Sequence, residues 1–297
     1  METKFFMVKR VAAINDLSGF GKCSLTATIP VLAAMGVQAC PLPTAILSNQ
    51  TGYDSYYIDD YTTHMETIMD EWEKQKFTFD GIYSGFLSHS SQVDKVYEFI
   101  ERFCQKDTFV LIDPVLGDDG EPYKTSTPEL IEKMRELIAH AHVITPNLTE
   151  ACILTGTNYR EVAELEGDPM IERISQIAEQ LIEMGVKTPV ITGIRNRNQQ
   201  TGQKYFCNIF KEDGTYIQAE TTVGDNIFHG SYSGTGDLFA SVICGGLVQG
   251  RALREIVPIA AEFIRDAVEV TYQSGTNRND GVEFEPFLFQ LRGETKC

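Results

Sequence analysis

A glycine-rich stretch near the carboxyl end of the chain has the composition of a phosphate-binding turn. It reads Ser233-Gly-Thr-Gly-Asp237 and runs directly into an apolar segment with helical character. Glycines let a backbone approach a ligand closely, and the first N–H groups of a helix lack partners and attract anions. Asp237 could then take the proton of an attacking hydroxyl, or it could simply favour the helix dipole. The spacing alone leaves these two interpretations equally open.

A second acidic group follows an apolar run in the middle of the chain. In the segment 110–118, Asp113 ends a predicted strand and Asp118 follows in a loop that contains glycine. Mg²⁺ bound to a nucleotide needs only one or two carboxylates, because phosphates and water complete its octahedron. Asp113 and Asp118 have this chemistry, although an Asp-Pro turn and a solvated acidic loop would have the same appearance.

A third polar segment, Thr145-Pro-Asn147-Leu-Thr-Glu150, again follows an apolar run. In isolation it is best interpreted as a capping box, in which Asn147 caps a helix and Glu150 returns the hydrogen bond. Its position after another predicted strand is what makes a functional role a second interpretation.

Polar residues also follow the first predicted strand, in the segment Asn15–Ser24. The segment is not a P-loop, because position 16 holds Asp where that motif needs glycine. It is not a dinucleotide fingerprint either, because position 24 is serine and positions 17–53 contain no acidic residue. Asp16 and Ser18 remain candidates for holding a small polar substrate. The clusters 48–53 and 83–87 are, taken alone, more typical of a turn and of core aromatics.

The elements that must position these residues alternate along the chain. β-Branched runs predict strands over 8–15, 79–84, 108–113, 142–145 and 187–192. Amphipathic segments predict helices over 91–105, 126–139, 236–249 and 252–272, the second opening with a capping pattern at Ser126. A hairpin is expected within 203–220, around Glu212–Thr215. This alternation predicts an α/β protein with a parallel sheet covered on both faces and ligands at the carboxyl ends of its strands.

Composition excludes several classes of function. The net charge of −17 and the lack of a dense basic stripe argue against nucleic-acid binding. No apolar run approaches the roughly 18 residues of a membrane span, and the first residues do not resemble a signal peptide. Seven scattered cysteines without a C-x-x-C pair favour neither disulfides nor a zinc site. We expect a cytoplasmic protein with no nucleic-acid or membrane partner.

Taken together, the motifs resemble those of the pyridoxal kinases of the ribokinase-like superfamily, over nearly the whole chain. The likeness rests on SNQTGY (48–53), SGFL (84–87), DPVLGD (113–118), TPNLTEA (145–151) and GTGDLFA (234–240). Each motif is modest, but five in this order at similar spacing are quite specific. The resemblance implies a three-layer α/β/α ribokinase-like fold with a mostly parallel central sheet. It also implies little or no separate lid, so that a single kinase domain would span residues 1–297.

The resemblance further implies roles for individual residues. Asp237 would be the catalytic base, in an anion hole made by Gly234, Thr235 and Gly236. The magnesium ligands would be Asp113, Asp118 and Glu150. The ATP site would comprise these three residues with Thr145, Asn147 and Thr192. The substrate ring would contact Asp16, Ser18, Thr51, Phe86 and Tyr232.

The implied activity is ATP-dependent phosphorylation of the 5′-hydroxymethyl group of a vitamin B6 vitamer (pyridoxal, pyridoxamine or pyridoxine) in pyridoxal phosphate salvage. Members of the family usually form homodimers, and many require a monovalent cation such as K⁺ besides Mg²⁺.

Gln50 replaces a histidine common in pyridoxal kinases, and Asp16 replaces a serine. The opening Asp-Leu-Ser-Gly at 16–19 is closer to the hydroxymethylpyrimidine kinases of thiamine synthesis. Those enzymes commonly carry cysteine in place of Asp237, so they remain the nearest alternative. A nicotinamide-dependent oxidoreductase and a catalytically silent vitamin-binding protein are more distant alternatives.

Overall fold

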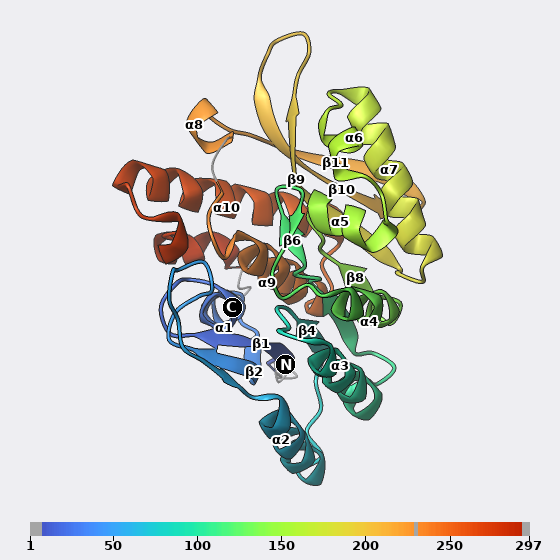
Figure 1. Cartoon of the computed structure of the whole chain (residues 1–297), viewed down its shortest axis with the longest axis vertical. Helices are drawn as coiled ribbons and strands as arrows, with labels where there is room; N and C mark the ends of the chain where they lie inside the picture. The colour runs from blue at the N-terminus through green and yellow to red at the C-terminus, as the bar shows by residue number, and fades with distance from the viewer. Residues whose placement is uncertain (1–7, 229–230, 293–297) are drawn as a thin grey trace, which may run out of the picture.

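A nine-stranded sheet forms the centre of the molecule in the computed structural model, which describes residues 8–228 and 231–292 (Figure 1). Its strands are β1 (Arg10–Ser18), β2 (Gln38–Leu47), β3 (Ile58–Asp60), β4 (Gly81–Ser84), β5 (Phe109–Ile112), β8 (Val143–Ile144), β9 (Thr188–Arg197), β10 (Lys204–Glu212) and β11 (Thr215–Thr222). The order across the sheet is β11-β10-β9-β8-β5-β4-β1-β2-β3. From β9 to β2 all neighbours are parallel, whereas β3, β10 and β11 are antiparallel additions at the edges.

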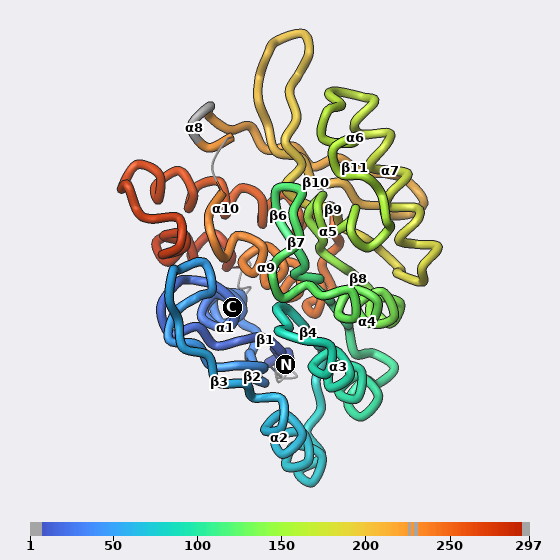
Figure 2. Tube along the Cα trace, in the orientation of Figure 1, coloured from blue at the N-terminus to red at the C-terminus, as the bar shows by residue number. Residues whose placement is uncertain are grey.

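Helices cover both faces of this sheet. One face carries α1 (Ser24–Ala34), α9 (Thr235–Val248) and α10 (Leu253–Ser274). The other carries α2 (Thr62–Lys74), α3 (Ser90–Phe103), α4 (Pro128–Ile138), α5 (Leu148–Thr155) and α7 (Asp168–Glu183). The described chain also contains the short helices α6 (Tyr159–Ala163) and α8 (Asp225–Phe228) and the 3-10 turns η1 (Arg278–Asp280) and η2 (Glu285–Leu291). Figure 2 shows the amino-terminal helix α1 beside the carboxyl-terminal helix α9, so that segments far apart in the sequence pack together.

The alternation of side chains along each strand explains the two layers. In β5, Val110 and Ile112 pack into the core beneath α2–α7, whereas Leu111 packs beneath α9 and α10. Because successive side chains of a strand point to opposite faces, a continuous apolar run is buried on both sides. The predicted three-layer α/β fold with a mostly parallel sheet is therefore confirmed.

The predicted hairpin within 203–220 is also confirmed, as the antiparallel pair of β10 and β11. Its turn lies at Asp213 and Gly214, both with positive φ (51° and 77°), as a tight hairpin turn requires. Two strand ends were wrong. β1 continues to Ser18, and β9 continues through Thr192 to Arg197, because β10 extends its ladder with an antiparallel partner. Thr192 therefore lies inside β9 rather than at its carboxyl end.

Two further local predictions were wrong because other segments supply hydrogen-bond partners that the local sequence does not reveal. Asp118 is not in an open loop, but in the two-residue strand β6 (Gly117–Asp118), which pairs with β7 (Glu121–Pro122). The capping pattern at Ser126 does not form. Thr127 caps α4 instead, by accepting the N–H of Leu130 at 3.2 Å. Tertiary partners compete for the other members of that pattern.

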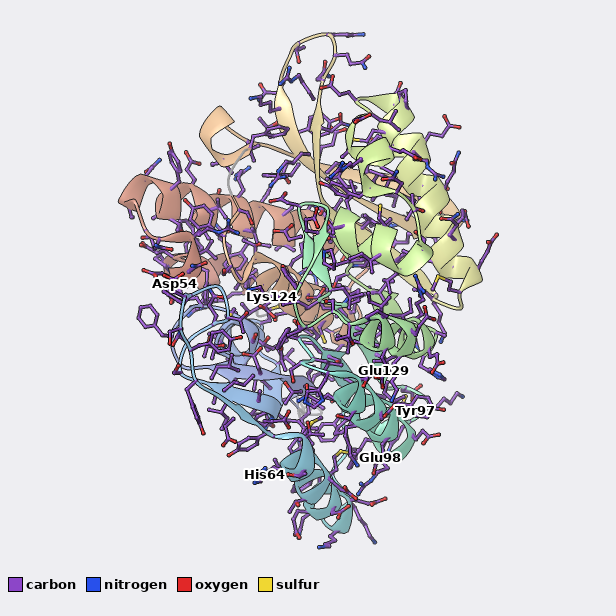
Figure 3. The ribbon with its side chains drawn as sticks, in the orientation of Figure 1. Asp54, His64, Tyr97, Glu98, Lys124 and Glu129 are labelled. Atoms are coloured by element: carbon purple, nitrogen blue, oxygen red, sulfur yellow. The ribbon has the colours of Figure 1, made fainter. Side chains whose placement is uncertain are left out.

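Ser126 and Glu129 form hydrogen bonds with other segments instead of with each other's backbone. The Ser126 hydroxyl donates to the carbonyl of Leu116 at 2.6 Å, and the Glu129 carboxylate accepts from Ser90 of α3 at 2.8 Å. Glu129 is labelled in Figure 3. The six cysteines within the described ranges are free thiols, and four of them are buried. None of the helices in those ranges is long and apolar enough to cross a membrane.

Candidate active site

The carboxyl end of β5 and the start of α9 bring two acidic motifs together, although they are far apart in the sequence. Asp237 lies in the first turn of α9, and Asp113 directly follows β5. A Cβ atom placed on Gly236 would lie 3.8 Å from Oδ2 of Asp113. The start of α9 thus faces the end of β5, and the proposed base and the proposed metal ligand share one site.

Asp237 is held by groups from the beginning of the chain. Nδ2 of Asn15 donates to its Oδ1 at 3.0 Å. Burial raises the pKa of Asp237 to about 6, and the charge of Asp16 adds to this, while the backbone N–H of Ser24 and the Asn15 amide oppose it. Such a carboxylate is deprotonated at neutral pH and still a far better proton acceptor than an ordinary Asp, which suits a general base.

The turn before α9 has the geometry expected of an anion-binding turn. Gly234 caps the helix with φ of 85°, and a Cβ atom there would lie 2.0 Å from the carbonyl oxygen of Lys22. Only glycine fits this contact. The Thr235 hydroxyl donates to the carbonyl of Tyr232 at 3.2 Å, which closes the turn. Because the first N–H groups of a helix have no intrahelical partner, those of α9 are available to a phosphoryl group.

Asp113 is almost completely buried, and it accepts the Thr145 hydroxyl on Oδ1 at 2.8 Å. Burial, followed by the charge of Asp237, raises the pKa of Asp113 to about 7, against the lowering effect of Thr145. The predicted neighbours Asp113 and Thr145 are therefore in direct contact. Two carboxylates forced together in this way are a place where a cation would relieve repulsion.

Glu150 and Asn147 form the predicted capping box of α5. The two carboxylate oxygens of Glu150 accept the N–H groups of Leu116 (3.1 Å) and Asn147 (2.8 Å). Burial, and then the charge of Asp113, raises the pKa of Glu150 well above its ordinary value. The helix-capping interpretation is confirmed. The Glu150 carboxylate also interacts electrostatically with Asp113 in the acidic site.

The donor set fits Mg²⁺ only in part. Across residues 8–228 and 231–292, no three His, Cys, Asp or Glu side chains lie close enough together to hold a metal ion by themselves. Asp113 retains one oxygen without a hydrogen bond to protein, whereas both oxygens of Glu150 and both oxygens of Asp118 already accept one. This fits a nucleotide-bound Mg²⁺, which takes one or two carboxylates and completes its shell with phosphates and water.

The remaining predicted nucleotide residues lie beside this cluster. Asn147 forms a bridge with Thr192 of β9 and donates through Nδ2 to the carbonyl of Gly117 at 2.9 Å. Asp118, next to Gly117, accepts the Ser231 hydroxyl at 3.2 Å. The structure thus brings Asn147, Thr192 and Asp118 together near the carboxyl end of β8.

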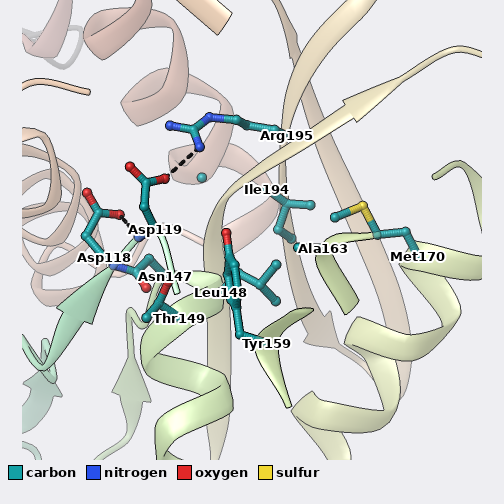
Figure 4. A pocket seen from close by; sticks show the side chains of 11 residues that line it. Asp118, Asp119, Asn147, Leu148, Thr149, Tyr159, Ala163, Met170, Ile194 and Arg195 are labelled. Atoms are coloured by element: carbon teal, nitrogen blue, oxygen red, sulfur yellow. Dashed lines mark hydrogen bonds and ion pairs between the residues drawn. The ribbon is translucent and has the colours of Figure 1, made fainter. Parts of the chain in front are cut away.

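A cavity of about 210 Å³ opens at this position (Figure 4). Asp118 and Asn147 line it, together with Arg195, whose guanidinium donates to Asp119 at 2.8 Å across the cavity. Asp237 and Asp113 are not among its lining residues. The cavity therefore lies next to the paired carboxylates rather than over them.

The predicted substrate residues have different surroundings. Asp16 is only 3 % exposed, and its carboxylate accepts the hydroxyls of Ser18 (2.8 Å) and Ser24. Phe86 is partly exposed, and its N–H is bound to the Asn15 side chain at 2.9 Å, one hydrogen bond away from Asp237. Thr51 lies exposed in the loop after β2.

Sequence reasoning missed several residues of this site. Asn15 had no assigned role, yet its side-chain amide binds Asp237. Two tyrosines also interact electrostatically with the acidic cluster. Burial, and then the charge of Asp237, raises the pKa of Tyr83. Burial, and then the charges of Glu150 and Asp118, raises the pKa of Tyr123. Asn15 could have been suspected as a polar residue ending an apolar strand, but no local pattern points to the two tyrosines.

Known proteins share this architecture and sequence. The family described as phosphomethylpyrimidine kinase matches residues 21–282. The pyridoxal kinase of Dictyostelium discoideum is 27% identical, over 80% of this chain and 78% of its own. The hydroxymethylpyrimidine/phosphomethylpyrimidine kinase of Bacillus subtilis is 25% identical, over 66% of each chain.

Solved structures agree with these sequence matches. A Bacteroides thetaiotaomicron protein, provisionally assigned as a phosphomethylpyrimidine kinase and crystallised with pyridoxal, is 36% identical with a TM-score of 0.84 over 96% of each chain. The pyridoxal kinase of Lactobacillus plantarum is 28% identical with a TM-score of 0.80, again over 96% of each chain.

Proposed function

The chain belongs to the phosphomethylpyrimidine kinase family, and from this premise we propose that it phosphorylates the 5′-hydroxymethyl group of a vitamin B6 vitamer with ATP. The observation that carries the proposal is the position of Asp237. Its carboxylate lies in the first turn of a helix, behind a glycine turn, with Asp113 opposite. A proton acceptor, an anion-binding helix start and an acidic cation site in one place are what phosphoryl transfer to an alcohol requires.

The proposed mechanism assigns a step to each group. Asp237 accepts the proton of the substrate hydroxyl as the oxygen attacks the γ-phosphorus of ATP, and the bond to the β-phosphate oxygen breaks to release ADP. The first N–H groups of α9 stabilise the negative charge on the transferred group. Asp113 and Asp118 would hold Mg²⁺, which neutralises charge on the phosphates when it is bound. In the proposal, the ATP site also includes Thr145, Asn147, Glu150 and Thr192, which lie beside the two proposed magnesium ligands.

Two findings support the choice of a B6 vitamer as the alcohol. The Bacteroides relative was crystallised with pyridoxal, and the relatives from Dictyostelium and Lactobacillus are pyridoxal kinases. In the proposal, Phe86 and Tyr232 flank the ring, and Thr51, Ser18 and Asp16 lie on its polar side. Use of Mg²⁺ with a monovalent cation such as K⁺, and a cytoplasmic homodimer, belong to the same proposal.

The second candidate substrate is hydroxymethylpyrimidine. The family description and the Bacillus subtilis relative favour it. The chemistry and the base would be unchanged, since both substrates present a hydroxymethyl group on a nitrogen heterocycle. Only the ring contacts differ between the two candidates.

A panel of alcohols separates these candidates. Purified protein with Mg²⁺ and ATP is given pyridoxal, pyridoxamine, pyridoxine or hydroxymethylpyrimidine, and ADP release is measured with identification of the phosphorylated product. We expect kcat/KM to be highest for one of the B6 vitamers. Preferential turnover of the pyrimidine would replace the substrate assignment, and turnover of none of the four would reject the proposed function.

A further inference from the structure

We propose that Arg195 binds a phosphate group of the nucleotide, and that Asp119 occupies its guanidinium in the ligand-free protein and is displaced when the nucleotide binds. The inference rests on the proposed function, because it takes a nucleotide to be the phosphoryl donor. It deepens that function by naming a residue that recognises the negative charge of the donor. Sequence reasoning assigned a role to neither residue.

The cavity at the carboxyl end of β8 is poor in positive charge. The carboxylates of Asp118 and Asp119 line it, whereas Arg195 is the single basic side chain among its described lining residues. The phosphates of a nucleotide are strongly negative, and a bound Mg²⁺ offsets only part of that charge. A nucleotide that enters beside these carboxylates therefore needs a further cation, and Arg195 is the one that this cavity offers.

The guanidinium of Arg195 is only partly used in the ligand-free protein. It donates from Nη1 to Oδ1 of Asp119 at 2.8 Å. Its Nε is buried and has no hydrogen-bond partner in the described part of the chain, which is rare for a buried donor. A guanidinium presents its N–H groups as a planar fork that matches two oxygens of a phosphate. A phosphate would therefore use this fork more fully than the single contact with Asp119 does.

The Asp119 carboxylate can leave Arg195 without disturbing the backbone around it. The side chains of Arg195 and Asp119 are 34 % and 56 % exposed, and an ion pair with this exposure contributes little to stability. Other contacts hold the turn. The N–H of Gly120 donates to the Thr149 hydroxyl at 2.9 Å, and the N–H of Asp119 donates to Oδ1 of Asp118 at 2.9 Å. Displacement of the carboxylate therefore requires only a rotation of its side chain.

Arg195, in contrast, projects from a fixed position. It lies in β9, where its backbone pairs with Phe206 of β10. Thr192 of the same strand forms a bridge with Asn147, which lines the cavity. Figure 4 shows the side chains of Arg195 and Asp119 pointing toward one another at the cavity. A fixed cation with a movable carboxylate partner is the arrangement expected where a ligand's phosphate replaces that carboxylate.

Calorimetric titration with ADP and Mg²⁺, without any alcohol, tests the inference because the two substitutions should change the affinity in opposite directions. Arg195→Ala should weaken ADP binding about tenfold or more, as loss of a hydrogen bond from a charged group does. Asp119→Asn should tighten it about two- to fivefold, the equivalent of one exposed ion pair. Asparagine keeps the turn, because Asp119 and Gly120 have φ of 49° and 84°, which Asn-Gly favours. A purely structural ion pair predicts weaker binding in both variants.

The chain offers a matched control for each substitution. Asp213 also precedes a glycine in a hairpin turn with positive φ, and it pairs with Arg254. Asp213→Asn removes the same charge from the same kind of turn and should leave the affinity for ADP within about twofold of the wild type. Arg197 lies two residues further along β9 and is not among the lining residues of the cavity. Arg197→Ala should likewise change the affinity less than about twofold.

Two further measurements separate a phosphate contact from a general effect of charge. Arg195→Lys should bind ADP more tightly than Arg195→Ala but less tightly than the wild type, because lysine keeps the charge and loses the planar fork. Adenosine has no phosphate, so its affinity should change less than about twofold in Arg195→Ala. Equal losses for adenosine and ADP would overturn the phosphate contact.

The remaining outcomes distinguish this inference from the proposed function. Arg195→Ala that binds ADP as tightly as Arg197→Ala, or Asp119→Asn that binds it more weakly than the wild type, would overturn the inference and leave the proposed function in place. If the wild type binds ADP through Arg195 but phosphorylates none of the four alcohols, the proposed function fails and the inference stands. A wild type that binds no ADP would overturn both.

Discussion

Asn15 donates to Asp237 at 3.0 Å, across 222 positions of sequence. The orientation of its amide is determined by the rest of its surroundings, because Oδ1 accepts the N–H groups of Phe86 (2.9 Å) and Asp16 (3.0 Å). Nδ2 must then face the carboxylate. One buried side chain thus connects the base to the segment that would line the substrate site.

Removing the proton acceptor should abolish most of the catalysis without unfolding the protein. Asp237→Asn keeps the shape of the side chain but cannot accept the proton, so we expect kcat to fall by about 10²-fold or more. Thermal unfolding should show an unchanged or slightly higher midpoint, since a raised-pKa carboxylate is being neutralised. An active variant, measured by ADP release, would remove Asp237 from the role of base.

The pH dependence of the reaction should report the same carboxylate. A base works in its deprotonated form, so kcat/KM should fall as pH decreases through the Asp237 pKa of about 6. Asn15→Leu removes a hydrogen bond that lowers this pKa, so the acidic limb should move to higher pH. The variant should then be most impaired near pH 6 and least near pH 8.5, whereas simple structural damage would lower the rate equally at every pH.

Gly85 is expected to tolerate no side chain, because a Cβ atom there would lie 2.3 Å from Nδ2 of Asn15. Gly85→Ala should displace the Asn15 amide from Asp237 and lower kcat by about tenfold, as loss of a hydrogen bond to a charged group does. Gly224→Ala is the control, since nothing lies within 4 Å of its added Cβ and its φ is not positive. Equal activity of the two variants would contradict the close contact at Gly85.

The buried carboxylates should destabilise the ligand-free protein at neutral pH. The folded-state pKa of Asp113, about 7, lies above its ordinary value of 3.8, so the folded state binds this proton more tightly than the unfolded state. The resulting stabilisation is complete at low pH and is lost as pH rises through about 7. Asp113→Asn should therefore raise the free energy of unfolding at pH 8 by about 1–3 kcal/mol and have little effect at pH 4.

Metal addition and removal provide the complementary measurement. Mg²⁺ should raise the unfolding midpoint of the wild type at pH 8 more than at pH 5, because its ligands are ionised only at the higher pH. A chelator should reverse the effect. Asp113→Asn should respond less to Mg²⁺ than the wild type does, and an equal response would place the ion elsewhere.

Local interactions can be predicted from the sequence of this chain, whereas long-range interactions cannot. Short-range patterns were predictable. The capping box of Asn147 and Glu150 depends on residues three positions apart, and the hairpin turn depends on the adjacent residues Asp213 and Gly214. Strand and helix periodicity predicted the three-layer fold, because burial on two faces dictates which positions are apolar. The order of the motifs, with Asp237 behind its glycine turn, also indicated the reaction class before any geometry was known.

The tertiary structure alone decided which groups surround Asp237 and Asp113. Contacts such as Asn15 with Asp237 or Thr145 with Asp113 join residues 222 and 32 positions apart, and no local pattern encodes them. The hydrogen bond from the Ser24 hydroxyl to Asp16 likewise forms only after β1 and α1 have packed together. Residue types and spacing determine which chemistry a chain can carry, whereas pKa values and proton-accepting geometry arise from burial and neighbours, which exist only once the sheet has formed.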